Sequence, residues 1–176
     1  MQKILLYYKF TPIADPEVVK LWQKTLCDSL NLRGRILVSH HGLNGTVGGE
    51  IEDLKKYIKE TKKFEGFKGI VFKWSEGTRE DFPRMSVKAR RELVGFKNSD
   101  GEFEVDENGV VGGGVHLKPS QVNQLVETFG DDVVFFDGRN AHEAQIGKFK
   151  NAIVPNTNTS RDFIKELESD KYNDIK

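Results

Sequence analysis

The feature that most constrains the fold is the order of segments within the first 80 of the chain's 176 residues. Helical patterns and short apolar stretches follow one another as strand–helix–strand–strand–helix–strand. This order is typical of the split β-α-β arrangement of ferredoxin-like domains, which we predict for residues 1–80. The expected strands are Ile4–Phe10, Arg35–Ser39, a short strand around Thr46–Val47, and Ile70–Trp74.

Both helices of this domain are predicted to be amphipathic. Asp15 is placed to cap the first helix, and Pro16 fits its first turn, where an N–H group has no partner inside the helix. The apolar face of that helix is predicted from residues that recur every fourth position, Val18, Trp22, Leu26 and Leu30. The apolar face of the second helix is predicted at Ile51, Leu54 and Ile58.

The segment Gly42–Thr46 predicts a tight turn, because its Asn-Gly pair tolerates positive φ. A turn of this kind also offers backbone N–H groups to a phosphate, although a plain hairpin explains the same pattern. The candidate RNA-binding residues here are Asn44, Gly45 and Thr46. His40 and His41 lie just before the turn and, as strand neighbours, point to opposite faces, which argues against a shared metal ion.

Charge is strongly segregated along the chain. The totals balance, with 27 basic and 27 acidic residues, which alone argues against a nucleic-acid partner. Residues 84–91, however, carry only basic charges, and residues 100–107 carry only acidic ones. A neutral total can therefore hide a basic face.

The basic charges fall on a segment, Met85–Phe96, whose period-two pattern predicts an extended strand. Alternate side chains on one face of a strand lie about 6.5–7 Å apart, close to the phosphate spacing of a nucleic-acid strand. The candidate RNA contacts are Arg84, Lys88 and Arg90, which form a basic stripe, together with Arg91. The candidate stacking residues are Trp74, Phe82 and Phe96. An edge strand kept soluble by its charges explains the pattern equally well.

Residues 81–118 are assigned to a connector that contains this strand and an acidic, Gly-rich loop, with a hinge at Gly112–Gly114. A new pattern begins at residue 119. Helices are expected from Pro119, at Ala141–Ile146 and at Arg161–Ser169, and buried strands at Val133–Asp137 and Ala152–Pro155. Alternation of this kind predicts a parallel α/β sheet, but two strands are too few to complete one. We therefore expect residues 119–176 to be an incomplete domain.

Asp137 and Arg139 are the candidate site residues of this last part. Asp137 ends a predicted strand, and parallel α/β sheets place their chemistry at such carboxyl ends. We expect Asp137 to anchor a neighbouring loop and Arg139 to pair with a carboxylate across the domain. Neither side chain is a nucleophile, so we assign both a supporting role.

The only cysteine, Cys27, excludes an internal disulfide and favours a reducing, cytoplasmic location. No neighbouring group lowers the pKa of its thiol, so we interpret it as structural. No apolar run approaches the roughly 18–20 residues of a membrane helix, and the N-terminus is unlike a signal peptide. We expect no metal and no cofactor.

Several segments together resemble a known family. The segment Asp137–Asn140, Glu143 and the segment Ile146–Ala152 resemble the opening half of a rhodanese domain. With three further segments, the chain is similar to the TrhO (YceA-type) family of rhodanese-containing tRNA uridine hydroxylases. Those further segments are Gly42–Thr46, Met85–Leu93 and Gly114–Pro119.

This resemblance implies oxygen-dependent hydroxylation of the wobble uridine of tRNA to 5-hydroxyuridine, with the anticodon arm as partner. It also implies an acylphosphatase-like domain, a connector and a rhodanese domain. The family's essential cysteine lies in a Cys-Thr-Gly-Gly-Ile-Arg-Cys loop, whose N–H groups and Arg lower the pKa of the thiol. We expect that loop beyond Lys176, and Cys27 does not correspond to it.

Two other functions remain open. A rhodanese domain also suits a sulfurtransferase that moves a persulfide sulfur. A chain without the cysteine loop also suits a non-catalytic RNA-binding or interaction module.

Overall fold

The computed structural model describes residues 1–91, 93, 104–167 and 169–172. The chain divides into two compact units, which are considered separately. The first unit consists of Met1–Leu93 and Glu104–Val111, and the second contains the chain from Gly112 onward. The mixed α/β class predicted from the sequence is confirmed.

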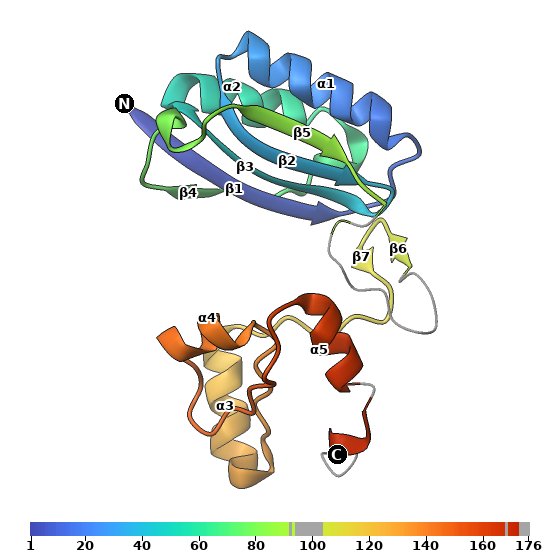
Figure 1. The fold of residues 1–176 in the computed structure, drawn as a ribbon, viewed down its shortest axis with the longest axis vertical. Coiled ribbons are helices and arrows are strands. Elements are labelled where there is room, and N and C mark those ends of the chain that lie inside the picture. Colours follow the sequence, from blue (N-terminus) through green and yellow to red (C-terminus); the bar gives the residue numbers. More distant parts are fainter. Residues whose placement is uncertain (92, 94–103, 168, 173–176) are drawn as a thin grey trace. The chain divides into compact units, whose positions relative to one another are not determined.

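The first unit is built on a five-stranded sheet with the order β4-β1-β3-β2-β5. β5 runs parallel to β2, and the other neighbours are antiparallel. Helices α1 (Pro16–Ser29) and α2 (Ile51–Thr61) cover one face of this sheet, as Figure 1 shows. The predicted ferredoxin-like order of the first elements is therefore correct. The strands are β1 (Gln2–Phe10), β2 (Arg33–Ser39), β3 (Gly42–Glu50), β4 (Lys73–Ser75) and β5 (Met85–Ala89).

Helix α1 begins as predicted, and Trp22, Leu26 and Leu30 of its predicted apolar face pack against the core, but the fully buried row is the neighbouring one. The Asp15 carboxylate accepts hydrogen bonds from the N–H groups of Glu17 and Val18, at 2.9 and 3.1 Å. Val18, expected in the core, is 60% exposed. The buried row is Val19, Gln23 and Cys27. A search for apolar residues misses this row because Gln23 is polar. The burial of Gln23 is tolerated because its Oε1 accepts a 2.5 Å hydrogen bond from Tyr57.

The tight turn predicted at Gly42–Thr46 is wrong, because these residues lie inside β3. The chain reverses instead at His40 and His41, which are therefore turn residues and not strand neighbours. The N–H groups of Thr11 and Ile13 donate to the carbonyls of His41 and His40, at 3.0 Å each. Pairing of β3 with strands on both sides thus overrides the local Asn-Gly signal.

β5 is part of the sheet and not of a connector. Met85 and Val87 pack against the core from one face of this strand, and Leu93 beyond it is buried. The hairpin formed by β6 (Val105–Asp106) and β7 (Gly109–Val110) belongs to the same unit. The predicted strand was longer than β5, and most of its second half falls outside the described residues.

β4 is shorter than predicted and begins later, at Lys73. Ile70 and Phe72, expected to pair in this strand, instead pack against the core just before it. Short 3-10 helices occur at Glu65–Phe67, Arg79–Asp81, Gly130–Asp132 and Asp170–Tyr172.

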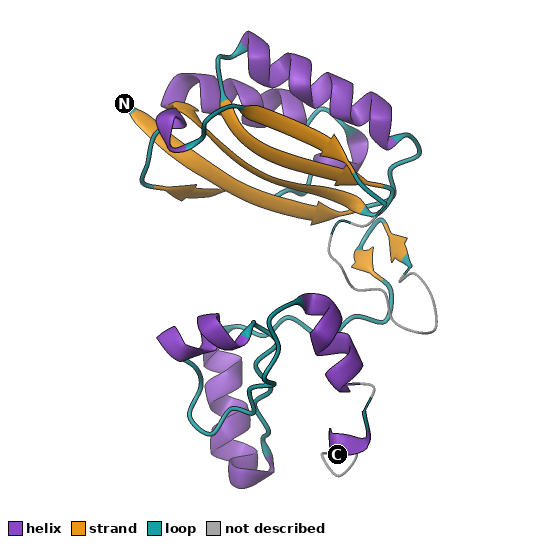
Figure 2. Ribbon diagram, viewed as in Figure 1, coloured by secondary structure: helices purple, strands orange, loops and turns teal. Residues whose placement is uncertain are grey.

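The second unit contains α3 (Pro119–Phe129), α4 (Ala141–Ile146) and α5 (Ser160–Leu167), close to the predicted helices. The two predicted buried strands do not form regular strands, although their segments pair in the predicted parallel direction. Their segments share one parallel bridge, Phe136 to Ile153, and Figure 2 draws them as loops. Val134 is 47% exposed. A single pair of extended segments has too few neighbours to form a stable sheet. Within the described ranges, no helix is both long enough and apolar enough to cross a membrane.

Candidate functional site

The sheet face opposite α1 and α2, termed the open face, carries the candidate RNA-binding side chains. Paired residues of neighbouring strands share a face, so the strand registers place side chains in rows. One row crosses the sheet through Lys73, Leu6, Thr46, Arg35 and Ser86. The next row runs through Tyr8, Asn44, Leu37 and Lys88. With strands about 4.8 Å apart, the second row spans roughly 14 Å.

The predicted basic stripe lies along β5 at the edge of the open face. Arg84, Lys88 and Arg90 are all exposed. The Arg84 carbonyl accepts a hydrogen bond from Gly34, and the Arg90 N–H donates to Val38 at 2.8 Å, so both residues remain in register with β2. Alternation then places all three side chains on the open face. Arg91 is exposed in a bend beyond β5, so the alternation of side chains along the strand does not tell which face of the sheet it lies on.

Asn44, Gly45 and Thr46 do not form a phosphate-binding turn. β3 pairs with β1 on one edge and β2 on the other, so the N–H groups of these residues are used within the sheet. The side chains of Asn44 and Thr46 belong to the open face. Gly45 faces the core, where an added Cβ would lie 2.2 Å from the Tyr7 hydroxyl.

Tyr8, an aromatic side chain on the open face, was not selected by the sequence analysis. Tyr8 is 57% exposed and lies opposite Asn44. Trp74 pairs with the buried Leu5, so it belongs to the face that the helices cover. Phe96 lies outside the described residues. β1 reads as one apolar run, so the exposure of Tyr8 appears only when the strand is placed between its neighbours.

Arg35 and Lys73 were also missed, and they extend the positive charge across the sheet. The open face therefore carries cations on β4, β2 and β5. The five strands of the sheet contain one acidic residue, Glu50 at the end of β3, and it forms an ion pair with the N-terminal ammonium. A basic surface with an exposed aromatic ring has the chemistry that binds single-stranded nucleic acid.

In the second unit, Asp137 and Arg139 form a closed pair. The Asp137 carboxylate accepts hydrogen bonds from Arg139 Nε at 2.9 Å and Nη2 at 2.6 Å, and from the Arg139 backbone N–H at 3.1 Å. These bonds lower the pKa of Asp137 to about 2. Arg139 also donates to the Gly147 carbonyl at 2.5 Å. The expected pairing of Arg139 across the domain is therefore wrong, since its partners Asp137 and Gly147 lie close by in the chain, on either side of α4.

This pair borders a pocket of about 540 Å³. Phe135 and Phe149 stack at its side with ring centroids 4.5 Å apart, and Lys148 adds a positive charge. Asn140 and Glu143 cap α4 through reciprocal hydrogen bonds of 2.9 and 3.1 Å, so their role is structural. The pocket is lined by cations, one carboxylate and aromatic rings, but by no thiol or hydroxyl group.

Cys27 is not a reactive group in this fold. Its side chain is fully buried on the core-facing side of α1. Burial, with a smaller contribution from Asp28, raises the pKa of the thiol to about 12. The structural interpretation of this cysteine is therefore confirmed. Among the residues that the structure describes, no three potential metal ligands lie together.

The sheet order and its two covering helices define the first unit as an acylphosphatase-like domain. The family model described as "UPF0176 acylphosphatase like domain" matches residues 2–93, and the chain belongs to this family. The match ends at Leu93, where the continuous part of the first compact unit also ends.

Similar curated proteins have a common name. A tRNA uridine(34) hydroxylase of Corynebacterium efficiens is 66% identical over 174 residues, which is 99% of this chain and 55% of the relative. The protein of the same name in Corynebacterium glutamicum is 67% identical with the same coverage. The chain therefore spans about half the length of these relatives. The family resemblance read from the sequence motifs is confirmed.

Proposed function

We propose that this chain is part of an enzyme that hydroxylates the wobble uridine of tRNA to 5-hydroxyuridine. The observation that carries the proposal is the 66–67% identity, across nearly the whole chain, with relatives that are named for this modification. The basic open face supports it, because tRNA is a polyanion whose binding needs several lysine or arginine contacts. Such an enzyme acts in the cytoplasm, with its tRNA.

The two units have different roles in this proposal. On the open face, the stripe of Arg84, Lys88 and Arg90 holds phosphates of the anticodon arm, and Asn44 and Thr46 supply hydrogen bonds. Arg91 adds positive charge beside the stripe. Residues 119–176 form the first part of a rhodanese-like domain.

The Asp137–Arg139 pair supports the site by holding its own loop closed. A reactive thiolate needs a lowered pKa, whereas burial raises that of Cys27. We therefore place the reactive cysteine beyond Lys176. The 176-residue chain by itself is expected to bind tRNA without modifying it.

Nucleoside mass spectrometry on tRNA tests the proposal. A strain that lacks the gene, and any redundant pathway, should lose 5-hydroxyuridine and the nucleosides made from it. The full-length gene should restore them, and Lys88→Glu with Arg90→Glu should restore them less well. The control is Lys55→Glu with Lys59→Glu, which makes the same charge change on α2. Unchanged 5-hydroxyuridine in the deletion strain would contradict the proposal, and a loss of 2-thiouridine in its place would favour sulfur transfer.

A further inference from the structure

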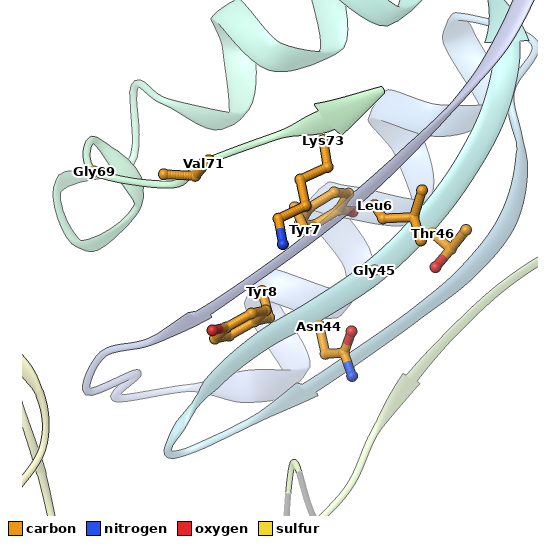
Figure 3. A pocket seen from close by; sticks show the side chains of 9 residues that line it. All are labelled: Leu6, Tyr7, Tyr8, Asn44, Gly45, Thr46, Gly69, Val71 and Lys73. Carbon is orange, nitrogen blue, oxygen red and sulfur yellow. The ribbon is translucent and has the colours of Figure 1, made fainter. Parts of the chain in front are cut away.

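A pocket of about 570 Å³ opens on the open face between β1, β3 and the segment before β4. Figure 3 shows Tyr8, Asn44 and Lys73 around it, with Leu6 and Thr46 on the strands between them. Its volume falls within the roughly 300–1,000 Å³ of small-ligand sites. Neither the core nor the sheet pairing requires these side chains to converge.

The apolar side chains of this pocket are exposed, although comparable ones nearby are buried. Val71 is 71% exposed and Leu6 40%, whereas Ile70 and Leu5 are almost completely buried. Alternation along the two segments sends one set of side chains to the core and the other to the pocket. Together with Tyr8, they form an apolar, partly aromatic surface beside polar groups, and such patches mark binding sites.

The polar groups of the pocket have unused hydrogen-bonding capacity. The Asn44 side-chain amide and the Lys73 ammonium make no hydrogen bond to any residue in the described part of the chain. An amide presents both a donor and an acceptor, which matches the edge of a nucleobase. An ammonium group is a point charge suited to a phosphate.

We propose that this pocket binds one unpaired RNA nucleotide, with its base stacked on Tyr8. Asn44 hydrogen-bonds to the edge of that base, and Lys73 contacts an adjacent phosphate. The identity of the polymer rests on the proposed function in tRNA modification. Aromatic side chains on a ferredoxin-like sheet have the geometry to stack single-stranded bases.

The surroundings of the pocket favour RNA over a protein partner. The row that begins at Lys73 leads to Arg35, and the row that begins at Tyr8 leads to Lys88. A strand of RNA that leaves the pocket across the sheet therefore meets further cations. Glu50, at the end of β3, is paired with the N-terminal ammonium, and the other acidic residues that the structure describes in this unit lie outside the five-stranded sheet. This arrangement is complementary to a polyanion.

The test measures binding of the 176-residue chain to two fluorescein-labelled probes at low salt. One is an oligouridine of about eight nucleotides, and the other is an abasic ribose–phosphate oligomer of equal length. Stacking of one base is worth about 5- to 150-fold in Kd. Tyr8→Ala and Tyr8→Leu should weaken oligouridine binding within that range, whereas Tyr8→Phe should retain it. None of the three should change the affinity for the abasic oligomer.

The other variants separate base recognition from charge. Asn44→Ala should weaken binding of the oligouridine alone. Lys73→Ala should weaken binding of both probes and lower the salt slope by about one. Matched controls are Trp74→Ala, which removes a 46% exposed aromatic ring from the opposite face, and Lys59→Ala on α2. Both should bind like the unmodified chain, and circular dichroism should show every variant folded.

Three results would overturn the pocket assignment. They are absence of oligouridine binding by the unmodified chain, insensitivity of that binding to Tyr8→Ala, and an equal effect of Tyr8→Ala on both probes. The deletion-strain experiment is independent of these outcomes. Loss of 5-hydroxyuridine combined with Tyr8-insensitive binding would support the proposed function and contradict nucleotide binding in the pocket. Unchanged 5-hydroxyuridine with Tyr8-dependent binding would contradict the proposed function and support nucleotide binding in the pocket.

Discussion

At the scale of single residues, Cys27 shows how burial decides chemistry. A thiol reacts as the thiolate, and the low dielectric of a core disfavours that charged form. The helix α1 packs Cys27 against the sheet, with Tyr57 and Tyr7 nearby, and the pKa of the thiol rises to about 12. The sequence showed only that no activating neighbour was present. The fold adds that burial itself makes the Cys27 thiol unreactive.

We predict that Cys27 resists labelling in the folded chain. At pH 8, reaction with Ellman's reagent should be at least about 1,000-fold slower than in guanidinium, because the thiolate fraction is so small. Guanidinium-unfolded protein, the control, should release one thiol per chain. Rapid stoichiometric labelling of folded protein would contradict the buried position.

The same pKa shift predicts how stability depends on pH. The folded pKa of Cys27 is raised to about 12, above an unfolded value of about 8.5. Its contribution is therefore complete below pH 8.5 and is lost as the pH rises toward the folded pKa. Urea unfolding should show a falling free energy between about pH 8.5 and 10. Cys27→Ala should flatten that fall, and an equal slope in both proteins would refute the linkage.

Gly45 is required by close packing and not by a turn. Its Cβ position is occupied by the ring of Tyr7, which is buried and held by a hydrogen bond to Tyr57. We predict that Gly45→Ala lowers the free energy of unfolding by about 1–3 kcal/mol through overpacking. Gly69→Ala is the control, since its Cβ would meet nothing within 4 Å. Comparable urea midpoints for the two variants would argue against this packing.

At the scale of elements, the pairing of β5 with the sheet places the basic residues of its sequence pattern on one exposed face. The period-two pattern predicted two faces, and the pairing with β2 determines which face packs on the core. Met85 and Val87 turn toward the helices, so Lys88 must lie on the open face beside Leu37. An edge strand protected by charge and an RNA contact are compatible, because exposed cations serve both purposes.

For this strand we predict that Lys88→Glu with Arg90→Glu weakens tRNA binding by the 176-residue chain. Two lost phosphate contacts should reduce the slope of log K against log salt by about two. Filter binding from 50 to 200 mM salt measures the slope. Lys55→Glu with Lys59→Glu on α2 carries the same charge change and should bind like the unmodified chain. Retained affinity with an unchanged slope would indicate that the charges of β5 only protect an edge strand from aggregation.

At the scale of the whole molecule, the first unit includes more chain than its ferredoxin-like core. Residues 1–80 contain the predicted order of elements, but β5 closes the β2 edge and Leu93 is buried. The family match to residues 2–93 has the same extent. A division at residue 80 would expose the edge of β2 and remove apolar side chains from the core.

We therefore predict that a fragment of residues 1–93 is more stable than one of residues 1–80. Loss of Met85, Val87 and Leu93 from the core should lower the free energy of unfolding by at least about 3 kcal/mol. Urea denaturation followed by circular dichroism compares the two fragments. A fragment of residues 1–111, which adds the β6–β7 hairpin, controls for length. Equal stability of the two shorter fragments would place the boundary at residue 80 after all.

The sequence by itself determined the order of the elements, the capping of α1 by Asp15, the helices of the second unit and the lack of an activated thiol. These features depend on local periodicity and on neighbouring residues. It did not determine the position of the β2–β3 reversal, the burial of Gln23 or the exposure of Tyr8. Those depend on strand register and on contacts between residues far apart in the chain. For the same reason, only the tertiary structure brought Tyr8, Asn44, Lys73 and the basic stripe onto one face of the sheet.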